Sequence, residues 1–419
     1  MNDKLFKIYK YAVENNPFYR ELYAETGCNF YNEVIFNANR DKLPIVKKSM
    51  LRDNVESILS SPYKQFPKYE DLSIIRSSGS TGEYLKIYWD KKDTVRSMLP
   101  SWIWRKKYYQ ITPLDKYISF HTVKHIGNKF IEDIVAIDEV NERHTSFSKI
   151  NLDENRITSF FEYVNKYNPV WMHLQPSILT LLYQQIDDKN KTLPNSIMLI
   201  ETTGEYFSKE IKNEMSKKLG IRIVDNYGCT ETNYIACECP CGKMHILSDN
   251  VFVEIVDENS GVVKKNDYGN ILVTSLHNHA MPLIRYDTGD IGRIDYGYRC
   301  NCGNMSPVLE LKGVRNSHVI KCCNKNISSY VVLYAIEKIN EQFNNAILQY
   351  KVTQKSMVEL MLELVIDKKF LGWEDTISKS FIDYIPDSNL KNIKWNITYK
   401  DHIYPDSQTG KLQFFKSNI

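Results

Sequence analysis

Strand-like and helix-like patterns of apolar residues alternate through the middle of the chain, from about residue 116 to residue 226. Short apolar runs typical of buried strands are separated by segments in which apolar residues recur at helical spacing. The predicted strands are 116–120, 170–174, 196–200 and 221–226, and the predicted helices are 157–167, 177–186 and 209–219. This alternation predicts an α/β layered domain with a mainly parallel sheet. Ligands bind beyond the carboxyl ends of such strands, where the loops 202–205 and 227–231 fall.

The amino-terminal part has a different pattern, which is helical at first. Helices are expected at 5–15, from Pro17 to near Gly27, and after the segment 43–46. A strand, a loop and a second strand then occupy 74–90. A helix follows at 94–109, and its Trp102, Trp104 and Tyr108 are expected in the core or in a pocket wall.

Beyond residue 231 the pattern changes to short alternating strands. Segments 251–256 and 270–276 predict an antiparallel sheet or barrel. From about residue 317 the order is mixed, with predicted helices at 328–340 and 377–384 and predicted strands at 346–354, 358–366 and 394–399. The expected fold class is therefore α/β with α+β parts. A large layered domain spans 1–315 with a β-subdomain at about 232–312, and a small α+β domain spans 316–419.

Composition narrows the class of protein and of partner. A chain of 419 residues is too long for one ordinary core, and 42% hydrophobic with 25% charged residues is typical of a soluble globular protein. The formal charge of +3 comes from 54 basic and 51 acidic residues, so neither nucleic acid nor an anionic membrane is expected as partner. The first twenty residues carry charges throughout and no apolar run approaches a membrane span, which predicts a cytoplasmic protein.

A loop of small residues lies between apolar 74–75 and the strand-like segment 85–89. Its residues are Ser77, Ser78, Gly79, Ser80, Thr81 and Gly82. Such a loop presents backbone N–H groups and hydroxyls to a polyanion such as the phosphates of a nucleotide. No Gly-Lys-Ser/Thr closes it, so it is not a Walker A loop. Taken by itself, a solvated turn is the commoner alternative for such a loop.

Four motifs in a fixed order identify a family. They are the loop 77–82, Asn-Tyr-Gly-Cys-Thr-Glu at 226–231, Arg-Tyr-Asp-Thr-Gly-Asp at 285–290, and Gly-Lys at 410–411. The chain resembles the adenylate-forming superfamily of acyl-CoA synthetases, adenylation domains and luciferases over nearly its whole length. Within it the chain looks most like the phenylacetate–CoA ligase branch, with the CapK and coenzyme F390 synthetase-like proteins. The short length, Pro-Phe-Tyr-Arg at 17–20, Leu-Pro-Ile at 43–45 and the Cys/His cluster support that branch.

The resemblance implies roles for the motif residues in binding ATP. Residues 77–81 would hold the β- and γ-phosphates, Thr230 would bind the α-phosphate, and Glu231 would coordinate Mg²⁺. The adenine pocket would be lined by Tyr227 and Gly228 from one motif and by Gly204 and Glu205 from an earlier loop.

Two further residues stand in the later motifs. Asp290 would accept hydrogen bonds from the ribose hydroxyls, although an aspartate in a Thr-Gly-Asp turn is common without any ligand. Lys411 would neutralise the developing charge of the adenylate when the small domain rotates, although a lysine near a chain end is usually solvated.

The chain departs from the family pattern at two places. Tyr84 replaces the proline usual after the small-residue loop, and Lys86 falls one place late. The hinge motif, normally Gly-Arg followed shortly by Asp, reads Gly-Val-Arg-Asn-Ser at 313–317. The resemblance then implies that Arg315 binds the nucleotide from a position displaced by one residue, with Asn316 as the pivot of rotation.

A second group of residues has the chemistry of a metal site. Six of the nine cysteines fall between Cys229 and Cys302, and clustering of this kind favours metal over disulfides. Cys-Pro-Cys-Gly and Cys-Asn-Cys-Gly are tight turns of the zinc-knuckle type. The candidate ligands of a structural Zn²⁺ are Cys239, His245, Cys300 and Cys302, with Cys241 able to displace one of them. The resemblance also implies a zinc site near here, and buried free thiols are the alternative.

The expected reaction follows from the resemblance. The chain would use ATP and Mg²⁺ to activate a small carboxylic acid, often aromatic in this branch, and pass the acyl group to a thiol. That thiol would belong to CoA or to the phosphopantetheine of an acyl carrier protein. Transfer of AMP to a hydroxyl, as in F390 synthetases, and a non-catalytic nucleotide-binding relative are the alternatives. The identity of the acid, the acceptor and a homodimeric state are left open.

Overall fold

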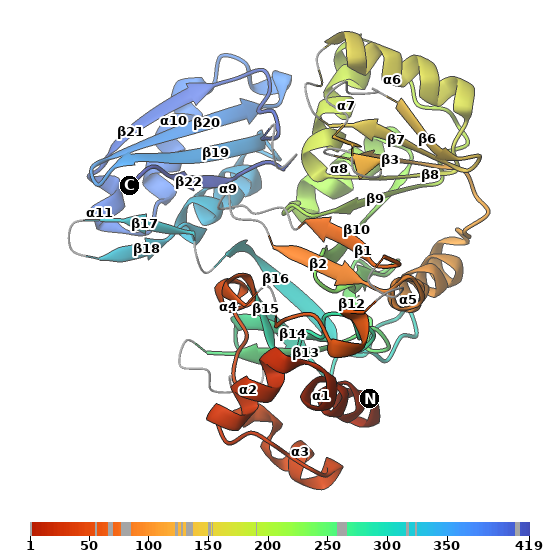
Figure 1. Cartoon of the computed structure of the whole chain (residues 1–419). Helices are drawn as coiled ribbons and strands as arrows, with labels where there is room; N and C mark the ends of the chain where they lie inside the picture. The colour runs from red at the N-terminus through yellow and green to blue at the C-terminus, as the bar shows by residue number, and fades with distance from the viewer. Residues whose placement is uncertain are drawn as a thin grey trace. The chain divides into compact units, whose positions relative to one another are not determined.

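The computed structural model describes residues 2–54, 57–65, 70–76, 85–121, 125–126, 129–130, 137–149, 152, 154–189, 191–257, 266–315, 318–322, 325–406 and 411–419. The chain forms two compact units, each made of two separate stretches (Figure 1). Unit 1 contains Met1–Thr112 and Asn226–Lys312, and unit 2 contains Pro113–Asp225 and Gly313–Ile419. The predicted domain division at residues 315 and 316 stays a prediction.

Four helices open unit 1 and share one aromatic-rich core. They are α1 (Asn2–Asn15), α2 (Pro17–Glu25), α3 (Glu33–Asn39) and α4 (Lys48–Asp53). The Asn16 side chain begins α2 by accepting a hydrogen bond from the Tyr19 backbone N–H. The backbone N–H of Ile284 donates to the Tyr19 hydroxyl at 2.9 Å. The amino-terminal helices therefore pack against a segment that follows more than 200 residues later in the chain.

The two predicted strands at 251–256 and 270–276 pair antiparallel in unit 1, as the alternating pattern predicts. The spatial order is β13 (Val251–Val256), β14 (Gly269–Ser275), β15 (Tyr286–Asp295), β16 (Val308–Arg315), β12 (Met244–Ile246), β11 (Asn233–Glu238) and β10 (Arg222–Cys229). The first residues of β10 and the last of β16 belong to unit 2. A separate hairpin joins β1 (Ser73–Arg76) and β2 (Lys86–Trp89), and the long helix α5 (Lys91–Tyr109) follows.

Unit 2 contains the predicted parallel strands. The order is β9 (Leu199–Thr203), β8 (Trp171–Leu174), β3 (Tyr117–His121), β7 (His144–Ser148) and β6 (Ile137–Asn141), and only the pairing of β6 with β7 is antiparallel among these. A short pair, β4 (His125–Ile126) and β5 (Lys129–Phe130), lies apart from this sheet. Apolar side chains of α6 (Glu154–Tyr167), α7 (Pro176–Lys189) and α8 (Lys209–Leu219) pack against one face of the strands. This part confirms the α/β layering.

The second stretch of unit 2 confirms the predicted mixture of helices and strands. Its sheet has the order β21 (Lys394–Tyr399), β20 (Glu359–Ile366), β19 (Ile347–Ser356) and β22 (Phe415–Ser417). Helices α9 (Tyr330–Gln342), α10 (Glu374–Tyr384) and α11 (Ser388–Lys391) supply apolar side chains to the same core, and β17 (Val319–Lys321) and β18 (Asn326–Ser328) form a hairpin.

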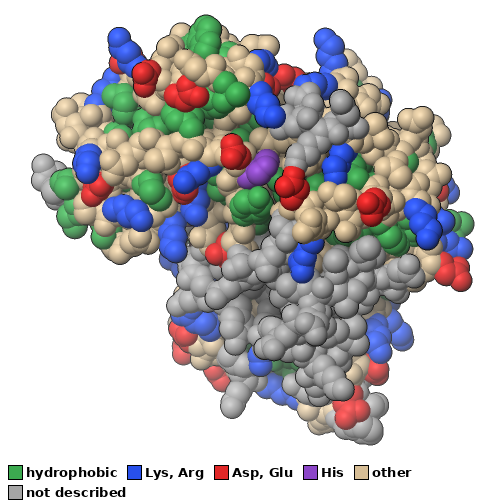
Figure 2. All heavy atoms as spheres, turned by 90° about the horizontal axis from the view of Figure 1, so that it is seen from above, with side chains coloured by type: hydrophobic (Ala, Val, Ile, Leu, Met, Phe, Trp, Pro, Cys, Tyr) green, Lys and Arg blue, Asp and Glu red, His purple; other side chains and the backbone are tan. Residues whose placement is uncertain are grey.

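The described surface carries mixed charge. Lys and Arg side chains are interspersed with Asp and Glu side chains on the face seen in Figure 2, in keeping with the formal charge of +3. Among the described residues, none of the helices combines the length and the apolar character needed to cross a bilayer.

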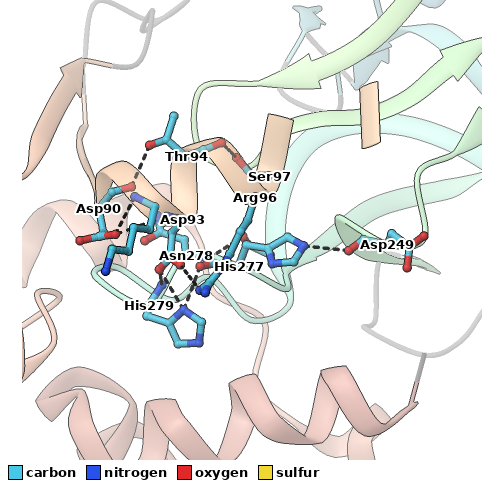
Figure 3. Close-up of polar contacts among 11 residues, drawn as sticks. Asp90, Asp93, Thr94, Arg96, Ser97, Asp249, His277, Asn278 and His279 are labelled. Atoms are coloured by element: carbon cyan, nitrogen blue, oxygen red, sulfur yellow. Dashed lines mark hydrogen bonds and ion pairs between the residues drawn. The ribbon is translucent and has the colours of Figure 1, made fainter. Parts of the chain in front are cut away.

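A buried acid holds the start of α5 to the loop at 277–279 within unit 1 (Figure 3). Asp93 accepts hydrogen bonds from the backbone N–H of His279 at 3.1 Å and from its ring Nδ1 at 2.9 Å. The hydrogen bond to Asp93 raises the pKa of His279. The same contacts outweigh burial and keep the pKa of Asp93 below its usual value. Both shifts widen the pH range over which Asp93 and His279 are charged together.

Because of this ion pair, we expect the free energy of unfolding to decrease as the pH rises above neutrality. A raised pKa in the folded state contributes stability that is complete below about pH 6.5 and is lost as the pH rises through the folded pKa of His279. The half-exposed histidine limits the effect to about 1 kcal/mol. Thermal unfolding from pH 6 to pH 9 should therefore show a decline in wild type that His279→Gln lacks.

His277 provides the control for this pH effect. Burial lowers its pKa, so its contribution has the opposite sign and is lost on acidification below pH 6.5. His277→Gln should leave the alkaline decline in place. An unchanged alkaline decline in His279→Gln would show that another group causes it.

Candidate functional site

The hairpin of β10 and β11 carries the Tyr-Gly-Cys-Thr-Glu motif in unit 1. The pairing shifts at Tyr227 and Gly228, where Tyr227 lies opposite Ala236 and Gly228 lies opposite Tyr234. A Cβ at Gly228 would stand 2.5 Å from the carbonyl oxygen of Asn233, so only glycine lets the two backbones approach here. A bulge of this kind changes the direction of the side chains that follow it on the strand.

Tyr227 and Asp290 are brought together by two different strands. The Tyr227 hydroxyl on β10 donates a hydrogen bond of 2.8 Å to Oδ2 of Asp290 on β15. Burial, together with the charge of Asp290, raises the pKa of Tyr227 well above its usual value, so its hydroxyl keeps its proton. The backbone N–H of Asp290 donates to the Thr288 hydroxyl, which fixes the turn on which the carboxylate stands. An adenine-lining tyrosine and a ribose-binding aspartate would be neighbours in this arrangement.

Thr230 and Glu231 lie at the tip of the same hairpin. The Glu231 side chain is buried, and the Tyr286 hydroxyl donates to its Oε1 at 3.0 Å. The ring N–H of Trp89, two residues before α5, donates to the carbonyl oxygen of Thr230 at 3.4 Å. The hydrogen bond from Tyr286 orients the carboxylate, which is the oxygen-ligand type that Mg²⁺ requires. The residues present at Thr230 and Glu231 therefore fit the predicted metal and phosphate roles.

A second group of predicted residues meets in unit 2, beyond the carboxyl end of β9. Gly204 has a φ of +82°, which lets the chain turn sharply after the strand. Glu205 follows and accepts hydrogen bonds from the backbone N–H and the hydroxyl of Ser177, at 2.9 and 3.0 Å. The first turn of α7 therefore holds the Glu205 carboxylate in place.

Lys411 lies against this loop. A Cβ at Gly204 would stand 3.6 Å from Cε and 3.8 Å from Nζ of Lys411. The next residue, Leu412, donates its backbone N–H to Oε1 of Glu205 at 2.6 Å. Gly204, Glu205 and Lys411, which the motifs single out from segments about 200 residues apart, thus form one contact within unit 2.

Lys149 joins the same group and has no motif that could reveal it from sequence. It follows β7 at the carboxyl end of a parallel strand and is only 7% exposed. Burial, with a further contribution from the charge of Lys411, lowers its pKa to about 8, against the attraction of Glu205. Burial also raises the pKa of Glu205, which the N–H donors of Leu412 and Ser177 and the charge of Lys149 oppose.

We expect Lys149→Met to stabilise the folded protein at pH 7. A lysine whose pKa falls from 10.5 to about 8 on folding destabilises the folded state at any pH below 10.5, and the full cost applies below pH 8. The gain should be about 2–3 kcal/mol at pH 7 and should shrink between pH 8 and pH 10.5. Urea unfolding at several pH values measures it, with the exposed Lys166→Met as control. A loss of stability in Lys149→Met at pH 7 would contradict this sign.

Other predicted residues contribute less to this picture. The loop of Ser77, Ser78, Gly79, Ser80, Thr81 and Gly82 lies outside the described residues, as do Gly410 and the predicted pivot Asn316. The flanking strands β1 and β2 are described and pair as a hairpin. Arg315 ends β16, and its carbonyl oxygen accepts the backbone N–H of His318.

The cysteine and histidine candidates converge in unit 1. The described ligand atoms of Cys239, His245, Cys300 and Cys302 all lie within 4.8 Å of one another. The sulfurs of Cys239 and Cys300 are 3.6 Å apart, and the Cys302 sulfur lies 3.5 Å from Nε2 of His245. Tetrahedral Zn²⁺ with bonds of about 2.3 Å would place two sulfurs about 3.8 Å apart. The spacing fits a closed tetrahedral zinc site.

The surroundings of His245 favour the same metal. Its Nδ1 lies 2.9 Å from the carbonyl oxygen of Ser306, which can only accept, so Nδ1 carries the proton and Nε2 presents its lone pair to the thiols. In each knuckle turn a glycine N–H donates to the carbonyl oxygen of the first cysteine. Gly242 donates to Cys239, and Gly303 donates to Cys300. Cys241, the fifth candidate, is exposed and is not part of this group.

Comparison with known proteins places the chain in a family. Residues 35–280 match the profile of the family described as AMP-binding enzyme. The chain belongs to the AMP-binding enzyme family. The matched range contains the loop at 77–82 and the motif at 226–231, whereas Asp290 and Lys411 lie beyond it.

Curated relatives of this AMP-binding family member are phenylacetate-coenzyme A ligases. The protein from Pseudomonas putida is 25% identical over 300 residues, which are 68% of this chain and 64% of that relative. The protein from Thermus thermophilus is 24% identical over 335 residues, or 73% of this chain and 68% of that relative. The match thus spans less than two thirds of the Pseudomonas protein's length. The chain falls in the phenylacetate–CoA ligase-like branch of the adenylate-forming superfamily.

Solved structures of adenylate-forming ligases share the fold. A 2-hydroxyisobutyryl-CoA ligase in the postadenylation state, bound to an acyl-AMP, matches with a TM-score of 0.73 at 15% identity over 100% of this chain and 88% of that one. An anthranilate CoA ligase bound to anthranoyl-AMP matches with a TM-score of 0.55 at 14% identity over 90% of this chain and 74% of that one. The predicted fold class is confirmed.

Proposed function

We propose that this protein uses ATP and Mg²⁺ to convert a carboxylic acid into an acyl-adenylate with release of pyrophosphate, and then transfers the acyl group to a thiol. The acid is of the aryl or aryl-acetic type, by analogy with the phenylacetate-coenzyme A ligases among its relatives. The thiol is that of CoA or of a carrier-protein phosphopantetheine.

The contact between Lys411 and the Gly204–Glu205 loop carries the proposal. Adenylation creates negative charge on the α-phosphate and the departing pyrophosphate, and a fixed cation stabilises that charge most when it is positioned before the reaction. The Glu205 carboxylate holds the backbone of Leu412, so the neighbouring Lys411 ammonium is set over the loop that lines the adenine pocket.

Unit 1 carries its own candidate ATP-binding residues, on the hairpin of β10 and β11 and on β15. Mg²⁺, when bound, would supply positive charge to the phosphates. Glu231, oriented by Tyr286, provides a carboxylate ligand for it, and Thr230 provides a hydroxyl for the α-phosphate. Asp290 accepts from the ribose hydroxyls, and its bond with Tyr227 keeps it directed at the nucleotide.

The group of Cys239, His245, Cys300 and Cys302 binds Zn²⁺ in a structural role. Four soft ligands leave no coordination position for a substrate, so the metal holds the β-subdomain and takes no part in adenylation.

Acid-dependent exchange of labelled pyrophosphate into ATP tests the function. The purified protein is assayed with Mg²⁺ and a panel of aromatic and aliphatic acids, followed by thioester formation with CoA for every acid that supports exchange. We expect exchange with at least one aryl or aryl-acetic acid. Nucleotide binding without exchange for any acid would reject acid activation and leave AMP transfer to a hydroxyl or a non-catalytic role.

A further inference from the structure

The outward face of α5 combines exposed apolar residues with exposed cations. Val95, Leu99 and Ile103 follow one another at intervals of four residues and are 68%, 53% and 57% exposed. At this spacing their side chains form one row along the helix. A contiguous row of exposed apolar side chains is unusual, because the apolar rows of most helices face the core.

The helix contributes exposed charge of one sign to this face, and two of its cations, Lys91 and Arg96, already pair with Asp71 and Asp93. All of Lys91–Tyr109 is described, and its exposed charged residues are Lys91, Lys92, Arg96, Lys106 and Lys107. The one acidic residue of the helix, Asp93, is buried beneath it. Interspersed signs are typical of the chain as a whole, whose formal charge is +3, so this helix departs from the rest of the sequence. A basic face with an apolar row is complementary to an acidic amphipathic helix.

Helix α5 is held rigidly from its inner side. The Trp104 ring N–H and the Tyr109 hydroxyl both donate to the carbonyl oxygen of Glu238 on β11, at 2.9 and 2.6 Å. Asn233 donates to the Ser97 hydroxyl at 2.7 Å. These bonds fix the rotation of the helix, so the outer row is presented without any ordering cost at the time of binding.

The helix also begins beside the proposed reaction site. Trp89 lies two residues before α5 and donates to the carbonyl oxygen of Thr230. At 1.5 Å per residue the helix is about 28 Å long, so every point of its outer face lies within that distance of its start near Thr230. A partner seated on α5 could therefore reach the site with a long flexible arm.

We propose that the exposed face of α5 docks an acidic amphipathic helix of a carrier protein, which delivers its phosphopantetheine thiol to the acyl-adenylate. This inference rests on the proposed function and names the acceptor that the proposed function leaves open. The apolar row meets the apolar row of the partner helix, and the flanking lysines pair with its carboxylates. In the transfer itself the thiol sulfur attacks the acyl carbon, AMP leaves with the electrons of the acyl–phosphate bond, and the thiol proton passes to solvent.

A protein helix fits this face better than a lipid surface. Binding at a membrane interface needs a broad apolar face, with bulky residues such as Trp or Phe entering the acyl boundary. The α5 face offers a single row of three aliphatic side chains with cations on both sides, which is the width of one helix.

Acyl transfer to a holo-acyl carrier protein, compared with transfer to CoA, tests the proposal. The variant Lys92→Glu/Lys106→Glu reverses two charges beside the row, and Lys209→Glu/Lys217→Glu on α8 makes the same charge change at exposed positions elsewhere. We expect the α5 variant to lower kcat/KM for the carrier protein at least tenfold at low salt. Its kcat/KM for CoA and its acid-dependent exchange should stay within twofold of wild type, as should every rate of the α8 control.

Other outcomes would overturn the docking proposal and leave acid activation intact. Equal losses in the α5 and α8 variants would show a non-specific charge effect. Efficient transfer to CoA with none to the carrier protein would exclude a carrier protein as the partner of α5. Binding to phosphatidylserine vesicles that the α5 variant abolishes, with carrier transfer unchanged, would make the face a lipid contact. Failure of exchange with every acid would instead reject the proposed function itself.

Discussion

Replacing Lys411 by alanine should reduce acid-dependent ATP–pyrophosphate exchange by about 10²–10³-fold, with little change in the apparent KM for ATP. The lysine acts on charge that develops only as the α-phosphate is attacked, so its loss raises the barrier more than it weakens binding. The Lys411 side chain lies against Gly204, and the backbone N–H of the neighbouring Leu412 donates to the Glu205 carboxylate. Initial rates at saturating acid give the change in kcat directly.

A matched lysine separates this effect from a loss of charge near the chain end. Lys416 is exposed on β22, five residues further along, and Lys416→Ala should exchange at the wild-type rate. Glu205→Gln keeps the shape of the side chain and weakens its hydrogen bond to Leu412, so it should show a smaller loss than Lys411→Ala. Exchange at the wild-type rate by Lys411→Ala would show that Lys411 takes no part in adenylation.

The purified protein should contain one Zn²⁺ per chain, and Cys239→Ser should lose it together with a large part of its thermal stability. Replacing a ligand should weaken zinc binding at least a hundredfold, since changes to groups that only support the ligands already cost 10–100-fold. A hundredfold loss corresponds to about 2.7 kcal/mol, which lowers the Tm of a unit of about 200 residues, the size of unit 1, by about 5–11 °C. Metal analysis and thermal unfolding with and without a chelator measure the two effects.

Cys241→Ser is the control for this substitution. Cys241 stands two residues from Cys239 on the same knuckle but is exposed and outside the four-residue group. It should retain zinc and the wild-type Tm. Equal zinc loss in both variants would mean that Cys241 is a ligand, and protein without zinc but with unchanged stability would favour buried thiols.

Elements with a strong local pattern could be predicted closely. Helix α8 and strands β13 and β21 have the bounds that the apolar periodicity predicts, because each presents one clear apolar face to a core. The parallel pairing of the unit 2 strands could be predicted from the alternation of strands and helices. The motif residues and the two Cys turns could be singled out as candidates because each motif is short and carries its own chemistry.

Features that depend on contacts between distant residues could not be predicted. Strand β7 reads His-Thr-Ser-Phe-Ser, which is too polar for a buried strand, yet the Thr145 hydroxyl pairs with that of Tyr163 and Ser146 pairs with Ser119. Lys149 gave no signal because its neighbours Glu205 and Lys411 come from other parts of the chain. Hydrogen bonds and charges of this kind appear only once the fold is known.

The division of each unit into two stretches has a consequence for synthesis on the ribosome. The Tyr19 hydroxyl receives its hydrogen bond from Ile284, 265 residues later. At 5–20 residues per second, the first helices wait about 13–53 s before that segment exists. During this time the aromatic faces of α1 to α3 lack the segment that completes their core. A chaperone that shields nascent apolar surfaces should therefore raise the yield of folded protein.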